Sequence, residues 1–421
     1  MPYGADTVRA EIGWGRCLGT LDIGAAPALT DVPAAARAAM AAPLGDCAPL
    51  AAQVRPGEKI VIVVSDSFRT TGMEQVLPAL LEVLTAAGAR DEDITFLFST
   101  GTHRGPTEAE AEKILGPAVY ARFRERAITH DATDTANLVD LGTTSRGTPV
   151  KINRLAIEAD RLIVTGTVVM HYFGGFGGGR KSIVPGIASV ETIAANHSKN
   201  LHATENALDP SVRIGVMDGN PVAEDMLEAA RKVRTDFLIN TVLNRDNQIA
   251  GIYAGELAAA HQAAAEFARG LYAVPLPEQA DIVVASAGGA KNYLQSHKAL
   301  FNAHQALKPG GRIVFIARAA EGLGGNKLAN WLALGSREAI IAELRRNAEI
   351  NGQTALSTIE KAAVSEFVTE LSAEDVSILG GRKAASLEEA LERARQAVAP
   401  GGDPSIWLMP TASYAVPMRE M

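Results

Sequence analysis

The feature that most constrains this chain is an alternation of two kinds of segment along much of its length. Short runs of β-branched and other apolar residues are each followed by a longer stretch, rich in Ala, Leu and Glu, with helical periodicity. Such alternation is typical of an α/β fold, in which helices cover a largely parallel sheet. We therefore expect an α/β architecture with its ligands at the carboxyl ends of the strands.

A break in this alternation predicts two domains. The sequence Val-Pro-Leu-Pro-Glu at 274–278 disfavours both helix and sheet, and the alternation restarts after it with a strand at 282–286 and a helix at 291–307. A chain of 421 residues also exceeds what one hydrophobic core usually supports. We expect an N-terminal α/β domain at 1–273 and a smaller C-terminal α/β domain at 278–421.

The strongest element predictions lie in the first of these domains. Strands are expected at 60–65, 94–99 and 161–168, an antiparallel pair at 237–242 and 249–253, and helices at 73–87, 107–115, 189–202 and 256–271.

Charge and composition exclude several classes of function. The formal net charge is -8 and no stripe of Lys and Arg is present, which argues against a nucleic-acid partner. No apolar run is long enough to span a membrane, and the N-terminus does not resemble a signal peptide. Two cysteines, Cys17 and Cys47, are too few for a disulfide framework or a structural zinc site. We expect a cytoplasmic protein.

Polar side chains follow the first two predicted strands. Asp66 and Arg69 come after the first strand, and His103 lies on a Gly-containing loop after the second. A histidine so placed is a candidate general base, and Arg69 is a candidate anion ligand. The alternative is a capping aspartate with a surface arginine, and a solvated loop histidine.

The most unusual segment follows the third strand. Residues 174–179 contain five glycines, with His171 before them and Arg180-Lys181 after them. Glycines let the backbone approach a ligand closely and direct several N–H groups at an anion, so the segment predicts a phosphate-binding loop. A purely flexible loop would not need the flanking basic side chains.

This loop does not match the two common phosphate-binding motifs. A P-loop requires glycine at Arg180 and an unbroken helix beyond it, where Pro185-Gly186 stands instead. A dinucleotide fingerprint requires an acidic residue at the end of a second strand, and none lies at the expected distance.

Two histidines follow the loop, on the helix expected at 189–202. His197 and His202 are five residues apart, about 140° around a helix, so they would not share a metal ion. A single protein ligand would hold a metal tightly only if a cofactor supplied the others. The remaining histidines, at 130, 261, 297 and 304, are assigned with His202 to packing or solvent.

Taken together, these motifs resemble the nickel-dependent lactate racemase family. The resemblance rests on Asp66-x-x-Arg69, the Gly-flanked His103, His171 before a Gly-rich loop that ends in Lys181, and His197 beyond it. The stretch Asn-Tyr-Leu-Gln-Ser-His-Lys at 292–298 resembles the family's substrate-binding helix.

The resemblance implies a nickel-pincer nucleotide, a pyridinium-3-thioamide-5-thiocarboxylic acid mononucleotide made by dedicated cofactor-synthesis enzymes. Lys181 would be linked to it covalently, and His197 would be the one protein ligand to nickel. The other residues expected to bind the cofactor are Asp66, Gly174, Gly175, Gly177, Gly178 and Gly179.

The resemblance also implies the reaction, which is inversion of C2 in a small 2-hydroxy acid. Direct removal of the weakly acidic C2 proton is avoided because that hydrogen leaves as hydride, giving a 2-keto acid. His103 and His171 would serve as base and acid on opposite faces. Arg69, Gln295 and Lys298 would hold the substrate, and Leu294 would also line its binding site. The N-terminal domain would then bind the cofactor and the C-terminal domain would clamp the substrate, with the active site in the cleft between them.

Two departures from the family pattern lead us to expect a substrate larger than lactate. The family's tyrosine next to the glutamine falls at Leu294, and no tryptophan lies at 340–362, where the family pattern leads us to look for one. Loss of bulky aromatic side chains enlarges a small pocket. The alternative is that Tyr293 fills the space through a shifted register.

Two other functions remain open from sequence. A nicotinamide-dependent 2-hydroxy acid dehydrogenase would use the same residue types but needs the dinucleotide fingerprint that is missing. A non-catalytic cofactor-binding protein would need neither His103 nor His171.

Overall fold

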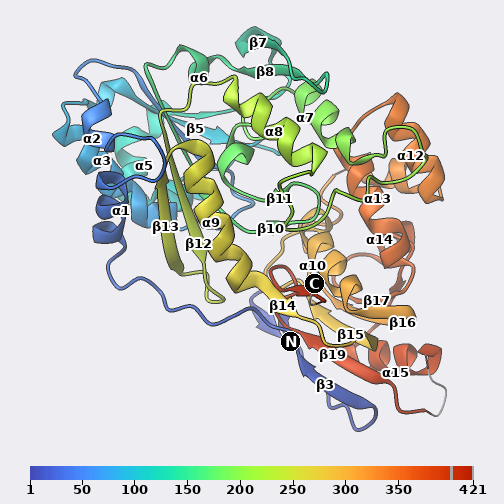
Figure 1. The fold of residues 1–421 in the computed structure, drawn as a ribbon. Helices are drawn as coiled ribbons and strands as arrows, with labels where there is room; N and C mark the ends of the chain where they lie inside the picture. The colour runs from blue at the N-terminus through green and yellow to red at the C-terminus, as the bar shows by residue number, and fades with distance from the viewer. Residues whose placement is uncertain (326, 399–401, 420–421) are drawn as a thin grey trace. The chain divides into compact units, whose positions relative to one another are not determined.

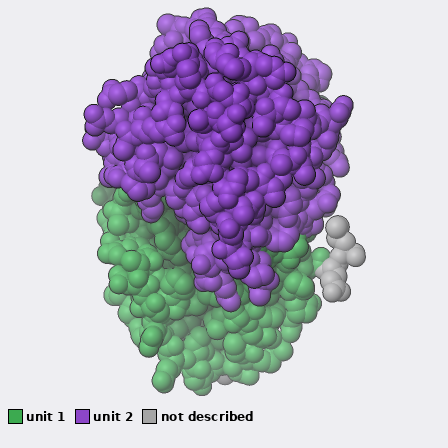
Figure 2. Space-filling view, turned by 90° about the vertical axis from the view of Figure 1, so that its left-hand side faces the viewer, with its two compact units in different colours: residues 1–24, 201–208, 270–421 green, residues 25–200, 209–269 purple. Residues whose placement is uncertain are grey.

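The computed structural model describes residues 1–325, 327–398 and 402–419. Its residues form two compact units, coloured separately in Figure 2. Unit 1 comprises residues 1–24, 201–208 and 270–421, and unit 2 comprises residues 25–200 and 209–269. Each unit has its own six-stranded, largely parallel sheet, so the predicted α/β fold is confirmed.

Unit 2 contains most of the predicted site residues. Its sheet has the order β13-β12-β9-β4-β5-β6, and all strands are parallel except the edge strand β13. The bounds are β4 Ile60–Ser65, β5 Ile94–Ser99, β6 Ala127–Thr129, β9 Arg161–Thr167, β12 Phe237–Leu243 and β13 Ile249–Gly255.

The helices of unit 2 bury both faces of this sheet (Figure 1). One core joins the buried side chains of α1 and α3 to those of β4 and β5. The bounds are α1 Val32–Ala41, α3 Met73–Ala86, α4 Glu108–Leu115, α5 Pro117–Phe123, α7 Val190–His197, α8 Pro221–Arg231 and α9 Leu257–Tyr272. Helix α7 begins at the predicted Ser189 cap but ends at His197, five residues earlier than expected, because a 3-10 turn at Ser198–Asn200 replaces its last turn.

The strand order of unit 2 reverses its direction at the centre of the sheet, between β4 and β9. From β4 the chain moves to β5 and β6 on one side, and it returns through β9 to the other side. Ligands bind beyond the carboxyl ends of parallel strands where the order reverses in this way. The loops after β4, β5 and β9 therefore meet at the expected ligand-binding edge.

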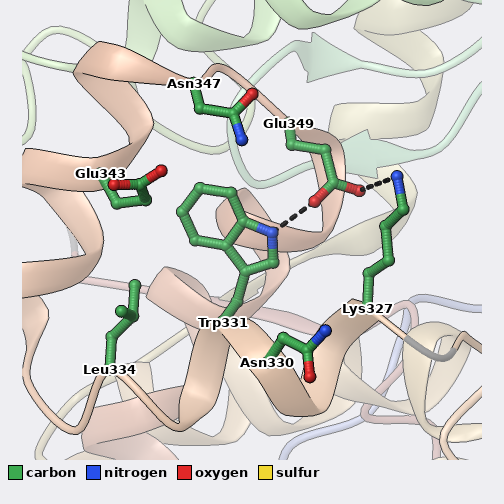
Figure 3. Close-up of a pocket in the computed structure, with 7 residues that line it drawn as sticks. All are labelled: Lys327, Asn330, Trp331, Leu334, Glu343, Asn347 and Glu349. Atoms are coloured by element: carbon green, nitrogen blue, oxygen red, sulfur yellow. Dashed lines mark hydrogen bonds and ion pairs between the residues drawn. The ribbon is translucent and has the colours of Figure 1, made fainter.

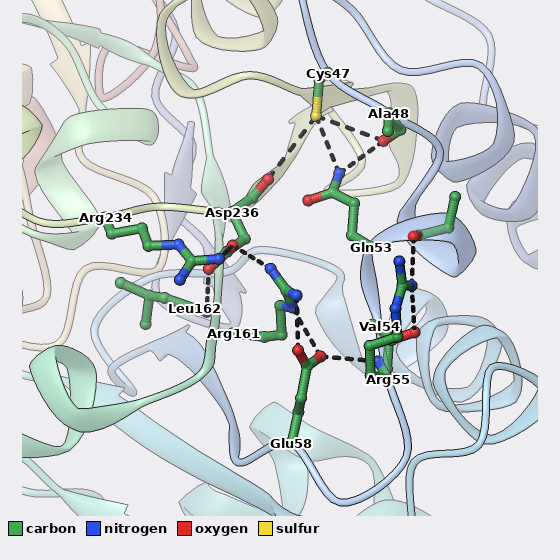
Figure 4. A network of polar contacts seen from close by, with 11 residues as sticks. Cys47, Ala48, Gln53, Val54, Arg55, Glu58, Arg161, Leu162, Arg234 and Asp236 are labelled. Carbon is green, nitrogen blue, oxygen red and sulfur yellow. Dashed lines mark hydrogen bonds and ion pairs between the residues drawn. The ribbon is translucent and has the colours of Figure 1, made fainter.

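The opposite, amino end of this sheet is held by an ion-pair network (Figure 4). Arg161, at the start of β9, donates to both oxygens of Glu58 at 2.8 and 2.7 Å and to Asp236 at 3.0 Å. Asp236 also accepts from the backbone N–H of Leu162. The network joins the segments that enter β4, β9 and β12.

Unit 1 is the second α/β unit. Its sheet has the order β18-β17-β16-β15-β19-β3, and every pair is parallel. The bounds are β3 Arg16–Thr20, β15 Ala280–Ser286, β16 Leu307–Ile316, β17 Ser365–Val368, β18 Arg382–Lys383 and β19 Ser405–Met409, with helices α10 Tyr293–Gln305, α11 Lys327–Leu332, α12 Arg337–Arg346, α13 Ile350–Ala362, α14 Ala373–Ile378 and α15 Leu387–Val398.

Contacts divide the chain near, but not at, the proline-rich break. The change of unit falls at Gly270, and the N-terminal residues 1–24 belong to unit 1. Residues 1–24 belong to unit 1 because β3 pairs with β19 at the edge of its sheet. The residues of β3 are exposed or half-buried, so their hydrophobic pattern does not reveal this pairing. Within the break, Ala273–Pro275 forms a short strand, β14, beside β20 (Val416–Met418).

Candidate active site

Asp66, Arg69 and His103 form one polar group at the ends of β4 and β5. The fully buried Asp66 carboxylate lies 2.7 Å from Nδ1 of His103 and 2.7 Å from Nη1 of Arg69. Its Oδ1 atom also accepts from the backbone N–H of Phe68 at 3.2 Å. The Phe68 ring packs edge-on against His103. The first two predicted motifs are therefore brought together.

The neighbours of Asp66 keep its carboxylate ionised. Burial opposes ionisation of Asp66, but Arg69 and His103 outweigh it and lower the pKa of Asp66 to about 2. An ionised carboxylate accepts a hydrogen bond, so Nδ1 of His103 carries the hydrogen and Nε2 of the neutral ring carries the lone pair. Both carboxylate oxygens of Asp66 therefore engage protein groups, and the expected cofactor contact of Asp66 stays a prediction.

A second group surrounds the Phe173 ring. His171 lies 4.5 Å from this ring and His197 lies 4.6 Å from it, centroid to centroid. Nζ of Lys181 lies 5.1 Å from the same centroid. A Cβ atom at Gly174 would be 3.6 Å from Lys181 Nζ and 3.7 Å from His171 Nδ1. Three predicted site residues thus converge on one aromatic side chain.

His171 and His103 differ in their hydrogen bonds. Nδ1 of His171 accepts from the backbone N–H groups of Phe173 at 3.4 Å and Gly174 at 3.2 Å. These donors favour a neutral ring with its hydrogen on Nε2, the reverse of His103. The two groups are connected through the backbone, because Gly101 near His103 donates to the carbonyl of Gly186 beyond Lys181 at 2.9 Å.

His197 is buried at the last residue of α7. Burial first, and then the nearby Lys181 charge, lower the pKa of His197 to about 3, although the Ile193 carbonyl one turn earlier acts in the opposite direction. Among the described residues, its buried Nδ1 atom has no hydrogen bond of good geometry, and the Ile193 carbonyl interacts with the ring only weakly. A metal ligand must be neutral, and a buried ring nitrogen without a partner is an unmet requirement that bound metal chemistry can explain.

The Gly-rich loop is held in a fixed shape. Gly178 and Gly179 have φ of 68° and 51°, a region that favours glycine, and a Cβ at Gly179 would lie 2.5 Å from the His261 ring. Asn240 on β12 accepts from the Gly179 N–H at 3.0 Å. The loop runs into a single four-residue 3-10 turn, Gly179–Ser182, so the expected failure of the P-loop motif is confirmed.

The buried side chains of Arg180 and His261 hold this loop in place through hydrogen bonds. Arg180 is only 2% exposed and donates to the carbonyls of Gly174 at 2.8 Å and Ala223 at 3.2 Å. Its Nη1 lies 3.0 Å from Nδ1 of His261, whose Nε2 lies 2.9 Å from the Gly177 carbonyl. Burial lowers the pKa of Arg180 to about 10, and burial together with Arg180 lowers that of His261 to about 3. His261 is therefore a neutral loop-holding residue.

Sequence reasoning assigned no role at this site to four residues. Phe173 lies inside the motif but carried no recognisable chemistry, and Arg180 was noted only as a basic residue that flanks the glycines. His261 and Asn240 come from distant elements and had no local pattern to mark them. The one available signal was His261, a histidine within an otherwise Ala-rich helical stretch.

Helix α10 of unit 1 carries the predicted substrate-binding residues. The oxygen of the Gln295 amide accepts from the Lys291 N–H at 2.9 Å, whereas its buried Nε2 has no hydrogen-bond partner among the residues that the structure describes. Gln295 and Lys298 occupy neighbouring positions on one face of the helix. Tyr293 is fully buried, and its hydroxyl lies 3.2 Å from the Thr358 hydroxyl, so Tyr293 does not take the place of the side chain at Leu294.

A tryptophan nevertheless contacts the segment at 340–362. Trp331 of α11 packs its indole on Gly352 of α13, where a Cβ would lie 2.8 Å from the ring, and donates to Glu349 (Figure 3). The ring borders an open cavity of about 370 Å³, which is also lined by Asn330 and Asn347. The segment lacks its own tryptophan, as read from the sequence, but another helix supplies an indole to it.

Two further properties of the described residues bear on the site. No helix within the described ranges is long and apolar enough to cross a membrane. Among the same residues, no group of three or more His, Cys, Asp or Glu side chains could hold a metal ion.

Comparison with known proteins identifies relatives of both units. The model of the lactate racemase N-terminal domain matches residues 3–209, and that of the lactate racemase C-terminal domain matches residues 276–412. Lactate racemase of Thermoanaerobacterium thermosaccharolyticum is 36% identical over 277 residues, which cover 65% of this chain and 63% of that protein. Lactate racemase of Lactiplantibacillus plantarum is 37% identical over 282 residues, or 66% of this chain and 64% of that protein.

Solved structures extend the likeness to nearly the whole chain. The lactate racemase apoprotein of Thermoanaerobacterium thermosaccharolyticum superposes with a TM-score of 0.86 and 30% identity, covering 99% of each chain. A protein of Thermotoga maritima superposes with a TM-score of 0.68 over 93% of this chain and 99% of its own, but at 18% identity it supports the fold alone.

Proposed function

The chain belongs to the lactate racemase family, and on that premise we propose that it inverts the configuration at C2 of a small 2-hydroxy acid. The observation that carries the proposal is the arrangement at the carboxyl end of the sheet in unit 2. There, Asp66 binds both His103 and Arg69, and His171, Lys181 and His197 surround Phe173.

The residues present suit a nickel-pincer nucleotide. His197 is neutral and has a buried ring nitrogen without a partner, and the Lys181 charge reaches it. We propose that Lys181 carries the nucleotide covalently, that His197 is its protein ligand to nickel, and that the backbone of residues 174–179 receives its phosphate. When bound, the cofactor supplies an acceptor and donor for the hydrogen on C2.

His103 is prepared to act as a base. The ionised Asp66 holds the hydrogen on Nδ1, so Nε2 can accept the hydroxyl proton of one enantiomer as the 2-keto acid forms. Asp66 also stabilises the imidazolium that results. Arg69 keeps 39% of its side chain exposed while bound to Asp66, so it retains N–H groups for the substrate carboxylate.

His171 is prepared for the opposite face. In the neutral ring its Nε2–H can donate to the substrate oxygen, since backbone donors occupy Nδ1. Full proton donation requires a charged ring, whose Nδ1–H would oppose those donors. Because these contacts are as long as 3.2 and 3.4 Å, a small rotation of the ring releases them. In unit 1, we propose that Gln295 and Lys298 bind the substrate.

The proposal is tested on protein made in a host that also makes the cofactor. Intact mass and nickel content establish loading, and a chiral assay measures inversion of each enantiomer of a set of 2-hydroxy acids without added nicotinamide nucleotide. Inversion only by loaded protein supports the proposal. A fully loaded protein that inverts no member of the set would favour the cofactor-binding alternative, and a strict requirement for NAD or NADP would favour the dehydrogenase.

A further inference from the structure

We propose that Asn220 is a positioning residue for His171. It fixes one peptide of the turn that follows His171, and this peptide holds the imidazole ring in one orientation and one tautomer. The inference rests on the proposed function, because it takes His171 as the group that exchanges a proton with the substrate oxygen on one face.

His171 begins a tight turn in unit 2. The turn joins two short strands, β10 (Met170–His171) and β11 (Gly175–Phe176). Within it, Nδ1 of His171 accepts from the backbone N–H groups of Phe173 at 3.4 Å and Gly174 at 3.2 Å. The orientation of the ring therefore depends on where these two N–H groups point.

The side chain of Asn220 fixes the direction of the Gly174 donor. Nδ2 of Asn220 donates to the Phe173 carbonyl at 2.9 Å. This carbonyl and the Gly174 N–H belong to the same trans peptide, so they point in opposite directions. A hydrogen bond that holds the carbonyl on one side therefore aims the N–H at His171 on the other side.

Asn220 is itself held firmly. It is fully buried and caps α8, where its Oδ1 accepts from the N–H groups of Val222 at 3.0 Å and Ala223 at 3.2 Å. Its Nδ2 donates a second hydrogen bond to the Val216 carbonyl at 2.9 Å. Both ends of the amide thus have two partners, which also fix the assignment of its oxygen and nitrogen. The helix cap gives the peptide of the turn a rigid support.

Arg180 holds the next peptide of the same turn. It donates to the Gly174 carbonyl at 2.8 Å and to the carbonyl of Ala223, in the first turn of α8, at 3.2 Å. Gly175 follows with a φ of 72°, and a Cβ there would lie 2.3 Å from the Val216 carbonyl oxygen. Two successive carbonyls of the turn are therefore tied to the start of α8.

This arrangement gives His171 a defined reactive nitrogen. With two donors at Nδ1, the neutral ring carries its hydrogen on Nε2, the ring nitrogen farther from the backbone. The ring rotates slightly when it takes up a proton, and the fixed donors return it to the same orientation after each turnover. Without Asn220 the peptide can rotate, so both tautomers and several ring orientations become populated. Turnover then falls more than substrate binding, because proton transfer requires a defined geometry.

The test separates this role from the helix cap. Asn220→Ser and Asn220→Asp both keep an N-cap oxygen for α8, because Ser, Asp and Asn are all favoured at that position. Neither variant presents an amide N–H to the Phe173 carbonyl. Asp31→Asn is the matched control, since it exchanges two of the same residue types at the exposed N-cap of α1. Urea titration establishes that each variant is folded.

The first measurement is the tautomer of His171 in the full-length, unloaded protein. Nitrogen NMR with isotopically labelled histidine reports it at a pH where the ring is neutral, and His171→Gln identifies the signals. We expect the Nε2–H tautomer in the wild type and in Asp31→Asn, and a mixture of tautomers in both Asn220 variants.

The second measurement is inversion by loaded protein. In both Asn220 variants kcat should fall roughly tenfold to a hundredfold while KM changes by less than about threefold. An unchanged tautomer in the folded variants, an Nδ1–H tautomer in the wild type, or unchanged kcat would each overturn the proposal. Loaded wild-type protein that inverts no 2-hydroxy acid would instead overturn the proposed function, on which the tautomer of the unloaded protein does not depend.

Discussion

The two ends of the sheet in unit 2 use charged side chains in different ways. At the amino end, Arg161 meets the carboxylates of Glu58 and Asp236, and each charge has an opposite charge within 3.0 Å. At the carboxyl end, the buried Arg180 has only uncharged partners in the described structure, and the buried His197 has a ring nitrogen without a hydrogen bond.

The difference indicates what each end is for. Paired charges with complete hydrogen bonds hold strands together and leave nothing for a ligand. A buried guanidinium without a carboxylate and an unsatisfied imidazole cost free energy in the protein alone, so they are expected where a bound group completes them. If this is correct, substitutions at the amino end should lower the stability of the fold, and substitutions at the carboxyl end should lower activity.

The largest effect is expected from Lys181→Ala. If Lys181 carries the nucleotide, protein made beside the cofactor-synthesis enzymes should be heavier than its sequence by one nucleotide, and the variant should lose both this increment and activity. The control is Lys59→Ala, at an exposed position before β4. Unmodified wild-type protein with full activity would contradict the assignment.

His103→Ala and His171→Ala should each lower kcat by about 10²- to 10⁴-fold in both directions, since each direction uses one ring as base and the other as acid. Asp66→Asn should give a smaller loss than His103→Ala, because it removes the support and keeps the base. Chiral assays from both enantiomers measure these losses. Near-normal inversion by either alanine variant would exclude the two-base scheme.

Arg161→Met should show the opposite behaviour. Removing the cation leaves Glu58 and Asp236 without their shared partner, and for these partly exposed groups we expect a loss of about 1–3 kcal/mol in the free energy of unfolding. The variant should still load cofactor and turn over normally per folded molecule. Urea titration and the chiral assay measure the two quantities. A variant with unchanged stability but reduced turnover would contradict a purely structural role for the amino end of the sheet.

A smaller effect is expected in how the free energy of unfolding depends on pH. Because the pKa of the buried His261 is lowered to about 3, the unfolded chain binds a proton between about pH 3 and its ordinary pKa near 6.5 that the folded chain does not. Stability should therefore fall as the pH is lowered from 6.5, by up to about 1.4 kcal/mol per pH unit for this group. His261→Gln should show a shallower slope in urea titrations of the unloaded protein, and an identical slope would contradict a neutral His261.

Features of the fold and site could be predicted where a short stretch of the sequence determines them. β4 and β5 were predicted to the residue because a fully buried parallel strand appears as a continuous apolar run. The sequence singled out His103, His171 and Lys181 by the Gly-containing loops that carry them, and His197 by the family resemblance, and their roles stay predictions. Phe173 looked like an ordinary core residue from its type alone.

Other features depend on distant pairing. β3 joins the sheet of unit 1 by pairing with β19, which follows it by almost 400 residues, and no local pattern marks such an edge strand. The contact between Arg180 and His261 also joins separate elements, so it could not be predicted from the sequence around either residue. The placement of the active site between the two predicted domains stays a prediction.

The most direct test of the central claim follows the hydrogen on C2. Loaded protein is given one enantiomer of a C2-deuterated 2-hydroxy acid in ordinary water, and deuterium in the inverted product is measured by mass spectrometry. If the hydrogen leaves and returns as hydride while His103 and His171 move only the hydroxyl proton, the inverted product should retain its deuterium at C2. Inverted product that has exchanged this deuterium for solvent hydrogen would show that the histidines act at C2 itself, and it would contradict the account.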